Sequence, residues 1–273
     1  MRKRGARLGQ HFLRSAWAAK KLVEAARTGR GDTVLEIGPG RGALSKELLA
    51  TGAHVIAVEK DPALVTKLQK TFAEEIASGQ FKLIESDIRD LDPRSLQLEA
   101  RSYAVAANIP YYITGEIIRR FLTAKRQPQR MALLVQKEVA ERIVGKATGH
   151  GQQAKESILS LSVKAYGKPR IVAKVSRGNF SPPPAVDSAI LVIEDISRDF
   201  FTSIDESAFF EIIRAGFASK RKFVVKNLGV RCQLSDVRTA FEACRIPESA
   251  RAEDVPLEKW QCLVGQLIVK SKK

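Results

Sequence analysis

The residues best suited to chemistry follow an apolar segment at positions 103–107 and read Asn108-Ile109-Pro110-Tyr111. A short apolar run bounded in this way predicts a buried strand, here ending in an amide, a proline and the two aromatic rings of Tyr111 and Tyr112. In open α/β sheets, ligands bind beyond the carboxyl ends of the strands. The amide and the ring therefore predict a binding site for a flat, nitrogen-bearing ring.

A glycine-rich segment at residues 38–42 follows a second apolar segment at 33–37. Glycines such as Gly38 and Gly40 let backbone N–H groups approach a ligand at the start of a helix. Glu59 follows about 20 residues later, at the end of the next predicted strand, where a carboxylate can accept hydrogen bonds from both ribose hydroxyls. Together these features indicate an adenosine-containing cofactor, either NAD or S-adenosylmethionine. A structural turn beside a solvated acid is the alternative.

Asp87 ends a third predicted strand and extends the same row of polar groups. Its carboxylate could accept a hydrogen bond from an adenine amino group, with the Ile88 backbone beside it, or could simply cap a helix. The segment 10–13, which contains His11 and Leu13, could close over the cofactor as a lid or pack as an ordinary N-terminal segment.

Methyl transfer to an exocyclic amine explains Asn108 better than hydride transfer does. The lone pair of an adenine N6 is delocalised into the ring, so the amine is a poor nucleophile until acceptors hold its hydrogens. Asn108 Oδ1 and the Ile109 carbonyl, held in place by Pro110, could be those acceptors. Tyr111 would stack on the base, a contact worth about 1–3 kcal/mol. No strong base is needed, so positioning would supply most of the catalysis. A strand-ending turn with a packed ring is the structural alternative.

The composition favours a polyanionic partner. The 273 residues include 46 Lys and Arg against 30 Asp and Glu, a formal net charge of +16. Neutralising phosphates with Lys and Arg releases counterions, so nucleic acid is the first candidate. The basic N-terminus lacks a following apolar segment, and no apolar run reaches about 18 residues. We therefore expect a cytoplasmic protein that is not bound to a membrane.

The three cysteines, Cys232, Cys244 and Cys262, are widely spaced, and so are the three histidines. No C-x-x-C pair or ligand set is present, so the sequence predicts no metal site and no disulfide framework. We expect reduced thiols packed in helices.

Strands and helices alternate through the first part of the chain, a cadence that predicts a parallel, doubly wound α/β sheet. The predicted strands span residues 33–37, 54–58, 81–84, a segment ending at 108, and 131–135. The predicted helices include residues 15–27, 114–124 and 137–144. Residues 146–155 are expected to form a loop, and 171–175 and 189–193 to form an antiparallel pair. From residue 199 the pattern is helical, at 209–217, 223–228, 237–241 and 257–268. This predicts a catalytic domain at 1–198 and a small all-helical domain at 199–273.

These motifs resemble, in order and spacing, those of the rRNA adenine N6-dimethyltransferase family, over nearly the whole chain. The matching segments are Glu36-Ile37-Gly38-Pro39-Gly40-Arg41-Gly42, Glu59-Lys60-Asp61, Asp87 and Asn108-Ile109-Pro110-Tyr111, with residues 10–13 as cofactor lid and 180–188 as a second aromatic loop. The resemblance implies a Rossmann-like, S-adenosylmethionine-dependent methyltransferase fold. It places cofactor contacts on His11, Leu13, Gly38, Glu59, Asp87 and Asn108, and the target base between Tyr111 and Phe180.

The C-terminal segments 217–222 and 251–254 resemble the small-subunit, KsgA-like branch of the family more than the large-subunit branch. This implies dimethylation of two adjacent adenosines in the 3′-terminal hairpin of small-subunit (16S) rRNA, within a pre-30S particle. The sequence leaves the oligomeric state open, and a monomer is the default expectation. Basic side chains of the helical domain would hold rRNA phosphates while the base is turned out of its stack, namely Lys220, Arg221, Lys222 and Lys226. The alternatives are an assembly factor whose binding matters more than its methylation, a large-subunit rRNA methyltransferase, and a nicotinamide oxidoreductase.

Overall fold

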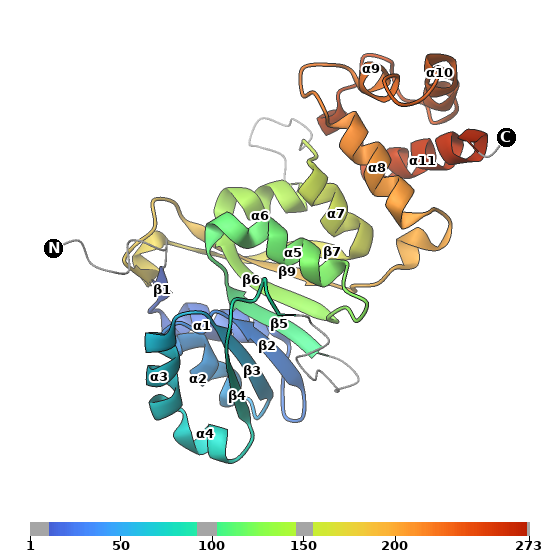
Figure 1. The fold of residues 1–273 in the computed structure, drawn as a ribbon. Coiled ribbons are helices and arrows are strands. Elements are labelled where there is room, and N and C mark those ends of the chain that lie inside the picture. The colour runs from blue at the N-terminus through green and yellow to red at the C-terminus, as the bar shows by residue number, and fades with distance from the viewer. Residues whose placement is uncertain (1–10, 92–102, 146–154, 272–273) are drawn as a thin grey trace. The chain divides into compact units, whose positions relative to one another are not determined.

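The chain forms two compact units in the computed structural model, which describes residues 11–91, 103–145 and 155–271 (Figure 1). The first unit contains Met1–Ala140 and Lys168–Ile196, and the second contains Glu141–Gly167 and Ser197–Lys273. The chain leaves the first unit for the last time between Ile196 and Ser197, close to the boundary expected at residue 198. The segment Glu141–Gly167, which the sequence analysis placed in the first domain, groups with the second unit. The functional division into 1–198 and 199–273 stays a prediction.

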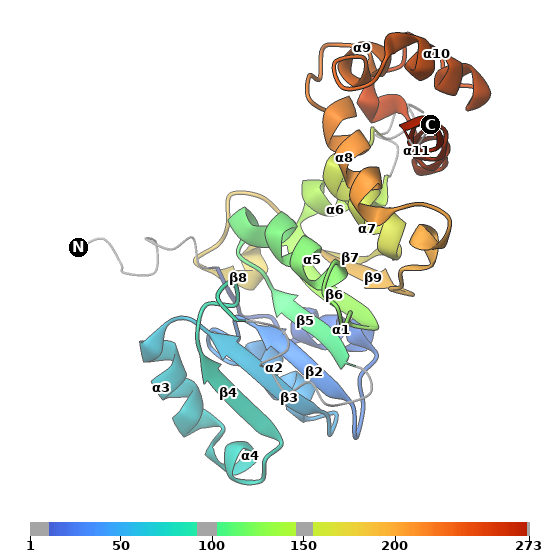
Figure 2. The ribbon, with the colours of Figure 1, turned by 45° about the vertical axis from the view of Figure 1, so that its right-hand side comes forward.

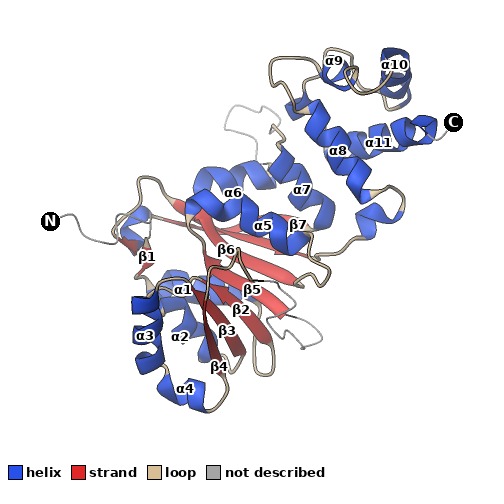
Figure 3. Cartoon of the chain, in the orientation of Figure 1, coloured by secondary structure: helices blue, strands red, loops and turns tan. Residues whose placement is uncertain are grey.

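A seven-stranded sheet forms the centre of the first unit (Figure 3). Its strand order is β4-β3-β2-β5-β6-β9-β7. The five strands from β4 to β6 pair in parallel, whereas β9 pairs antiparallel with both β6 and β7. These strands are β2 (Thr33–Ile37), β3 (His54–Glu59), β4 (Phe81–Glu85), β5 (Tyr103–Asn108), β6 (Arg130–Gln136), β7 (Lys168–Val175) and β9 (Ser188–Glu194). A separate two-stranded sheet pairs β1 (Phe12–Leu13) with β8 (Phe180–Ser181). The predicted parallel α/β sheet and its antiparallel pair are confirmed.

Helices cover both faces of this sheet, with α1, α2 and α3 on one face and α5 on the other (Figure 2). The helices that begin in this unit are α1 (Ala16–Ala26), α2 (Ala43–Leu49), α3 (Pro62–Thr71), α4 (Ala73–Ala77), α5 (Thr114–Leu122) and α6 (Lys137–Val144). Side-chain oxygens cap the N-termini of two of these helices. The Ser15 side chain accepts a hydrogen bond from Ala18 N, and the Asp61 side chain accepts one from Ala63 N. Such caps satisfy backbone N–H groups that have no partner within the helix. The apolar sides of α1 and α2 pack on the sheet in one continuous core.

The second unit is helical, as the sequence predicted. Its helices are α7 (Ile158–Tyr166), α8 (Glu206–Gly216), α9 (Val224–Leu228), α10 (Leu234–Ala243) and α11 (Leu257–Ser271). Trp260 is fully buried in their shared core. Gly216 permits this packing, because a Cβ there would lie 2.3 Å from Trp260 Cη2. No helix in the described ranges is long and apolar enough to cross a membrane.

The cysteine prediction was wrong in one respect. Cys244 and Cys262 form a disulfide, with their Cα atoms 5.8 Å apart, and Cys232 is free. The two cysteines are 18 residues apart in sequence, and they meet because α11 packs against α10, at whose end Cys244 lies. The spacing of the cysteines in the chain does not reveal this packing. The short strands β1 and β8 and the helix α7 were not predicted. The loop expected at 146–155, apart from its last residue, lies outside the described residues, as does the basic N-terminal arm.

Candidate active site

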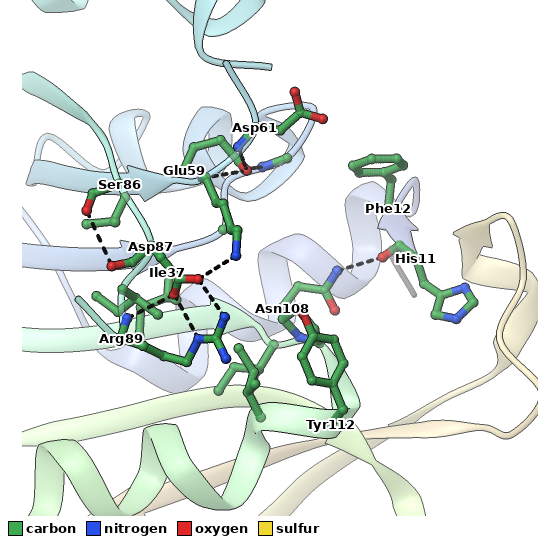
Figure 4. A pocket seen from close by; sticks show the side chains of 18 of the residues that line it. His11, Phe12, Ile37, Glu59, Asp61, Ser86, Asp87, Arg89, Asn108 and Tyr112 are labelled. Atoms are coloured by element: carbon green, nitrogen blue, oxygen red, sulfur yellow. Dashed lines mark hydrogen bonds and ion pairs between the residues drawn. The ribbon is translucent and has the colours of Figure 1, made fainter. Parts of the chain in front are cut away.

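A cavity of about 370 Å³ lies at the carboxyl ends of four neighbouring parallel strands (Figure 4). The strands β2 to β5 each contribute their last residue or the turn that follows it. The predicted residues that line it are His11, Gly38, Gly40, Glu59, Asp87, Ile88, Asn108, Ile109, Pro110 and Tyr111. Leu13 and Phe180 do not line it. The structure thus brings together most of the residues that sequence placed in one site.

Asn108 is held in a single orientation at the end of β5. Its Nδ2 donates a hydrogen bond of 2.9 Å to the His11 backbone oxygen, and its oxygen points away from His11 (Figure 4). Because a backbone carbonyl can only accept a hydrogen bond, the Asn108 atom that faces His11 must be the donor Nδ2, and the other atom is Oδ1. The neighbouring Ile109 is 1% exposed, and its N–H donates to Leu134 O of β6 over 3.3 Å. The end of β5 therefore presents an amide oxygen to the cavity from a rigid backbone.

Glu59 organises the backbone on the opposite wall of the cavity. One carboxylate oxygen accepts from Gly40 N at 3.0 Å, and the other accepts from the N–H groups of Lys60 and Asp61 at 2.9 and 3.0 Å. Glu59 is 5% exposed, so these bonds compensate for its burial. Gly40 has φ of +59°, and a Cβ there would lie 3.0 Å from the Phe12 ring. Glycine is therefore required both for the turn and for the close packing of β1.

Asp87 is surrounded by donors. Oδ1 accepts from the backbone N–H and the Nε of Arg89, both at 3.0 Å, and Oδ2 accepts from Arg89 Nη2 and Lys60 Nζ, both at 2.7 Å. The Arg89 side chain, followed by that of Lys60, lowers the pKa of Asp87 well below its usual range, although partial burial opposes this. Asp87 therefore caps the following turn and also carries an ion pair. An adenine amino group would have to replace one of these side-chain donors.

The lid segment is attached to the second aromatic loop. Phe12 pairs with Ser181 and Leu13 with Phe180 in the β1–β8 ladder, and His11 Nδ1 lies 2.8 Å from Pro182 O. On its other side, the Phe12 ring lies under the Arg41 guanidinium, 4.6 Å from the ring centroid. The His11 side chain is thus used to bind the loop, and its backbone oxygen to bind Asn108.

The two aromatic residues expected to sandwich a base are in different environments. The Tyr111 hydroxyl lies 2.7 Å from Ser188 Oγ, and burial raises the pKa of Tyr111, so its ring is fixed at the cavity. Phe180 is 3% exposed and packs in the core of the first unit. Tyr112, the second aromatic residue of the predicted stacking surface, lines the cavity and is 68% exposed. The Phe180 half of the sandwich stays a prediction that needs a different conformation of its loop.

The basic residues predicted to bind RNA lie in the second unit, between α8 and the end of α9. All four are exposed, and none makes an ion pair within the described part of the chain, namely Lys220, Arg221, Lys222 and Lys226. Buried Asn227 fixes the loop that carries the first three, because its Nδ2 donates to Gly216 O at 2.6 Å and to Ser219 O at 3.0 Å. The loop therefore presents several uncompensated positive charges from a fixed backbone.

Comparison with known proteins identifies the family. Residues 1–268 match the sequence profile described as Ribosomal RNA adenine dimethylase. The chain belongs to this family. The curated relatives of this rRNA adenine dimethylase include Ribosomal RNA small subunit methyltransferase A of Dehalococcoides mccartyi (strain CBDB1). It is 40% identical over 258 residues, which span 94% of this chain and 86% of the relative. The predicted family and enzyme class are confirmed.

Two solved structures of similar fold are a dimethyladenosine transferase from Plasmodium falciparum and the 23S rRNA methyltransferase ErmE. Each gives a TM-score of 0.73. The Plasmodium structure is 23% identical and covers 96% of this chain and 98% of its own. ErmE is 24% identical and covers 94% of this chain and 99% of its own. At these identities the likeness confirms the methyltransferase fold and nothing finer.

Three polar residues of the site were missed by sequence reasoning. Lys60 and Arg89 bind the Asp87 carboxylate, and Ser188 on β9 binds the Tyr111 hydroxyl. Lys60 and Arg89 were detectable, since each is within two residues of a predicted cofactor contact. Ser188 is 77 residues from Tyr111, so only the folded sheet reveals it.

Proposed function

We propose that this rRNA adenine dimethylase uses S-adenosylmethionine to methylate the N6 atoms of two adjacent adenosines in the 3′-terminal hairpin of small-subunit rRNA. The observation that carries the proposal is the fixed Asn108 amide, whose oxygen points away from His11 at a cavity bounded by Tyr111. A neutral amide accepts a hydrogen bond at every pH and needs no titration. It suits an amine whose lone pair must be released from the ring.

The residues of the cavity fit the proposed cofactor. Glu59 could accept from ribose hydroxyls, and Asp87 could accept from an adenine amine that replaces one of its side-chain donors. The glycine-rich turn at Gly38 and Gly40 also lines the cavity. A volume of about 370 Å³ is in the range of small-molecule sites. When bound, S-adenosylmethionine supplies an electrophilic methyl group. Asn108 and the Ile109 carbonyl would hold the amine hydrogens, and Tyr111 would hold the plane of the base. The contribution of these side chains is positioning.

The substrate assignment to the small subunit rests on relatives of 33–40% identity that carry that name. We propose that the four exposed cations of the second unit bind phosphates of the pre-30S particle and that the enzyme acts as a cytoplasmic monomer. An assembly factor that needs binding more than methylation is the second candidate, favoured by the uncompensated charge of the loop before α9.

The test is transfer of a tritiated methyl group to small-subunit particles that lack the modification, followed by mass spectrometry of the nucleosides. The wild type should form N6,N6-dimethyladenosine at two positions, and Asn108→Ala should reduce the rate by at least about 100-fold, provided that thermal unfolding shows it to be folded. Equal rates for both proteins would exclude the proposed role of Asn108. An Asn108→Ala protein that still restores particle assembly would support the second candidate.

A further inference from the structure

Tyr112 presents a largely free aromatic ring at the mouth of the main cavity. It belongs to the short 3-10 helix η3 (Tyr111–Ile113) between β5 and α5, and it lines the cavity although it is 68% exposed (Figure 4). No other aromatic ring in the described part of the chain is as exposed. Single exposed apolar side chains are common on protein surfaces. The feature that requires an explanation is the position of this one, at the entrance of the cavity.

The short helix holds Tyr112 in place but does not use its side chain. On one side, the Ile113 N–H donates to Pro110 O at 3.1 Å, and Ile113 is 8% exposed. On the other, the hydrogen bond between the Tyr111 hydroxyl and Ser188 Oγ fixes the preceding ring. The Tyr112 hydroxyl has no hydrogen-bond partner among the residues that the structure describes. Tyr112 is therefore a ring on a fixed backbone with an open surface.

The charged groups near Tyr112 are balanced among themselves. Arg89 interacts electrostatically with Tyr112 and with Glu116 in the first turn of α5. Its guanidinium is bonded to Asp87, which also binds Lys60. Two cations therefore face two carboxylates on this side of the mouth. The free surface of Tyr112 thus offers the face of a ring rather than a charge, and the ligand that fits it is a flat, uncharged ring.

Tyr111 and Tyr112 are suited to hold two neighbouring bases of one strand. A 3-10 helix has about three residues per turn, so consecutive side chains point about 120° apart. Tyr111 is partly buried at the cavity that Asn108 lines, whereas Tyr112 is turned to solvent. Consecutive Cα atoms are about 3.8 Å apart. A strand whose base contacts Tyr111 therefore carries its next base within reach of Tyr112 as it leaves the cavity.

We propose that Tyr112 is a stacking platform for the nucleobase next to the target adenosine, and that it holds the RNA strand while the methyl group is transferred. Every base has a π face, so such a contact tolerates any base. The ligand of this ring is thus a base of single-stranded RNA and not the cofactor. This inference rests on the proposed function, because it takes the target adenosine to lie against Tyr111.

The experiment compares two variants of the full chain in methyl transfer to small-subunit particles that lack the modification. Tyr112→Leu keeps an apolar side chain but has no flat ring, and loss of one base stack should lower kcat/KM for the particle about 5- to 150-fold. Tyr112→Phe keeps the ring and removes only a hydroxyl without a partner, so its kcat/KM should match that of the wild type. The affinity for S-adenosylmethionine, measured by calorimetry, should be the same in all three proteins.

Two altered particles identify the base that stacks. One carries an abasic nucleotide in place of the first adenosine of the pair and the other in place of the second, so each keeps one target. On the particle that lacks the base bound by Tyr112, the wild type should lose its whole advantage over Tyr112→Leu. A structural defect in the variant would leave that advantage unchanged on both particles.

Four results would each overturn the inference. They are an advantage of the wild type that persists on both abasic particles, a Tyr112→Phe protein as slow as Tyr112→Leu, weaker binding of S-adenosylmethionine by Tyr112→Leu, and a Tyr112→Leu protein as fast as the wild type. In the last case the wild type still methylates the intact particles, so the proposed function stands while the inference fails. If the wild type does not methylate them, the proposed function fails first and the inference fails with it.

Discussion

Removing the four positive charges of the second unit should change the salt dependence of RNA binding by a calculable amount. The side chains to be replaced by Ala together are Lys220, Arg221, Lys222 and Lys226. All four are exposed and make no ion pair within the described residues, so each is available to neutralise one phosphate. Each phosphate contact contributes about 0.7 to 0.9 to the slope of log K against log salt concentration. The magnitude of that slope should therefore fall by about 2.8 to 3.6 in the variant.

The assay is fluorescence anisotropy with a labelled fragment of small-subunit rRNA that contains the unmodified 3′-terminal hairpin. Between 0.1 and 0.4 M salt, the affinity advantage of the wild type over the variant should shrink about 50- to 150-fold. Binding of S-adenosylmethionine should not change, because all residues of the cavity belong to the first unit.

A matched control removes the same number of charges from exposed positions on α1, α2 and α3, namely Lys20, Lys46, Lys67 and Lys70. The slope of log K against log salt concentration for this control should stay within about 1 of the wild-type value. If both variants lose the same amount of slope, the loop before α9 is no special RNA contact and the effect is one of net charge. An unchanged slope in the first variant would refute the reasoning directly.

Three further substitutions, with Gly79→Ala as a control for one of them, test other structural features. Asn227→Ala removes one buried and one partly buried hydrogen bond and should lower the free energy of unfolding of the second unit by about 2 kcal/mol in a urea titration, together with weaker RNA binding. Gly42→Ala should destabilise the protein by about 2–4 kcal/mol, because φ is +83° and the new Cβ would lie 2.6 Å from Phe72 Cε2. Gly79→Ala, with φ of +78° and no atom within 4 Å of the Cβ, should cost only the strained backbone, about 1–2 kcal/mol. Asp87→Asn should lower the free energy of unfolding at neutral pH. The pKa of Asp87 is depressed in the folded state, so the loss of unfolding free energy in the variant should persist above pH 3.8 and shrink as the pH falls below that value. Denaturant titrations at several pH values measure this loss. A loss that does not depend on pH would exclude the ion pair as its source.

Features that depend on near neighbours in the chain were predictable from sequence. The strand at 33–37 was predicted with the bounds that the structure has, because a short and mostly apolar run between turn residues is typical of a buried parallel strand. The convergence of Gly38, Glu59 and Asn108 followed from the same pattern, since parallel strands place their carboxyl ends at one edge of the sheet. Even the cap at Asp61, with Pro62 following it, is a local signal.

Features that depend on distant partners were not predictable. The β1–β8 ladder joins residues 12 and 181, and two residues on each side leave no periodic pattern to detect. The burial of Phe180 follows from that ladder, and the pairing of Cys244 with Cys262 follows from how α10 and α11 pack.

The β1–β8 ladder also bears on the order of events during turnover. Phe12 packs on Gly40 at the cavity, and Leu13, the next residue, pairs with Phe180. A displacement of β1 that widens the cavity must either break this ladder or move the aromatic loop with it. Under the proposed function, exchange of the cofactor and rearrangement of the loop that carries Phe180 would therefore share a barrier. Two successive methylations of one nucleotide would each have to cross it, so retention of the RNA between them would depend on contacts made elsewhere in the chain.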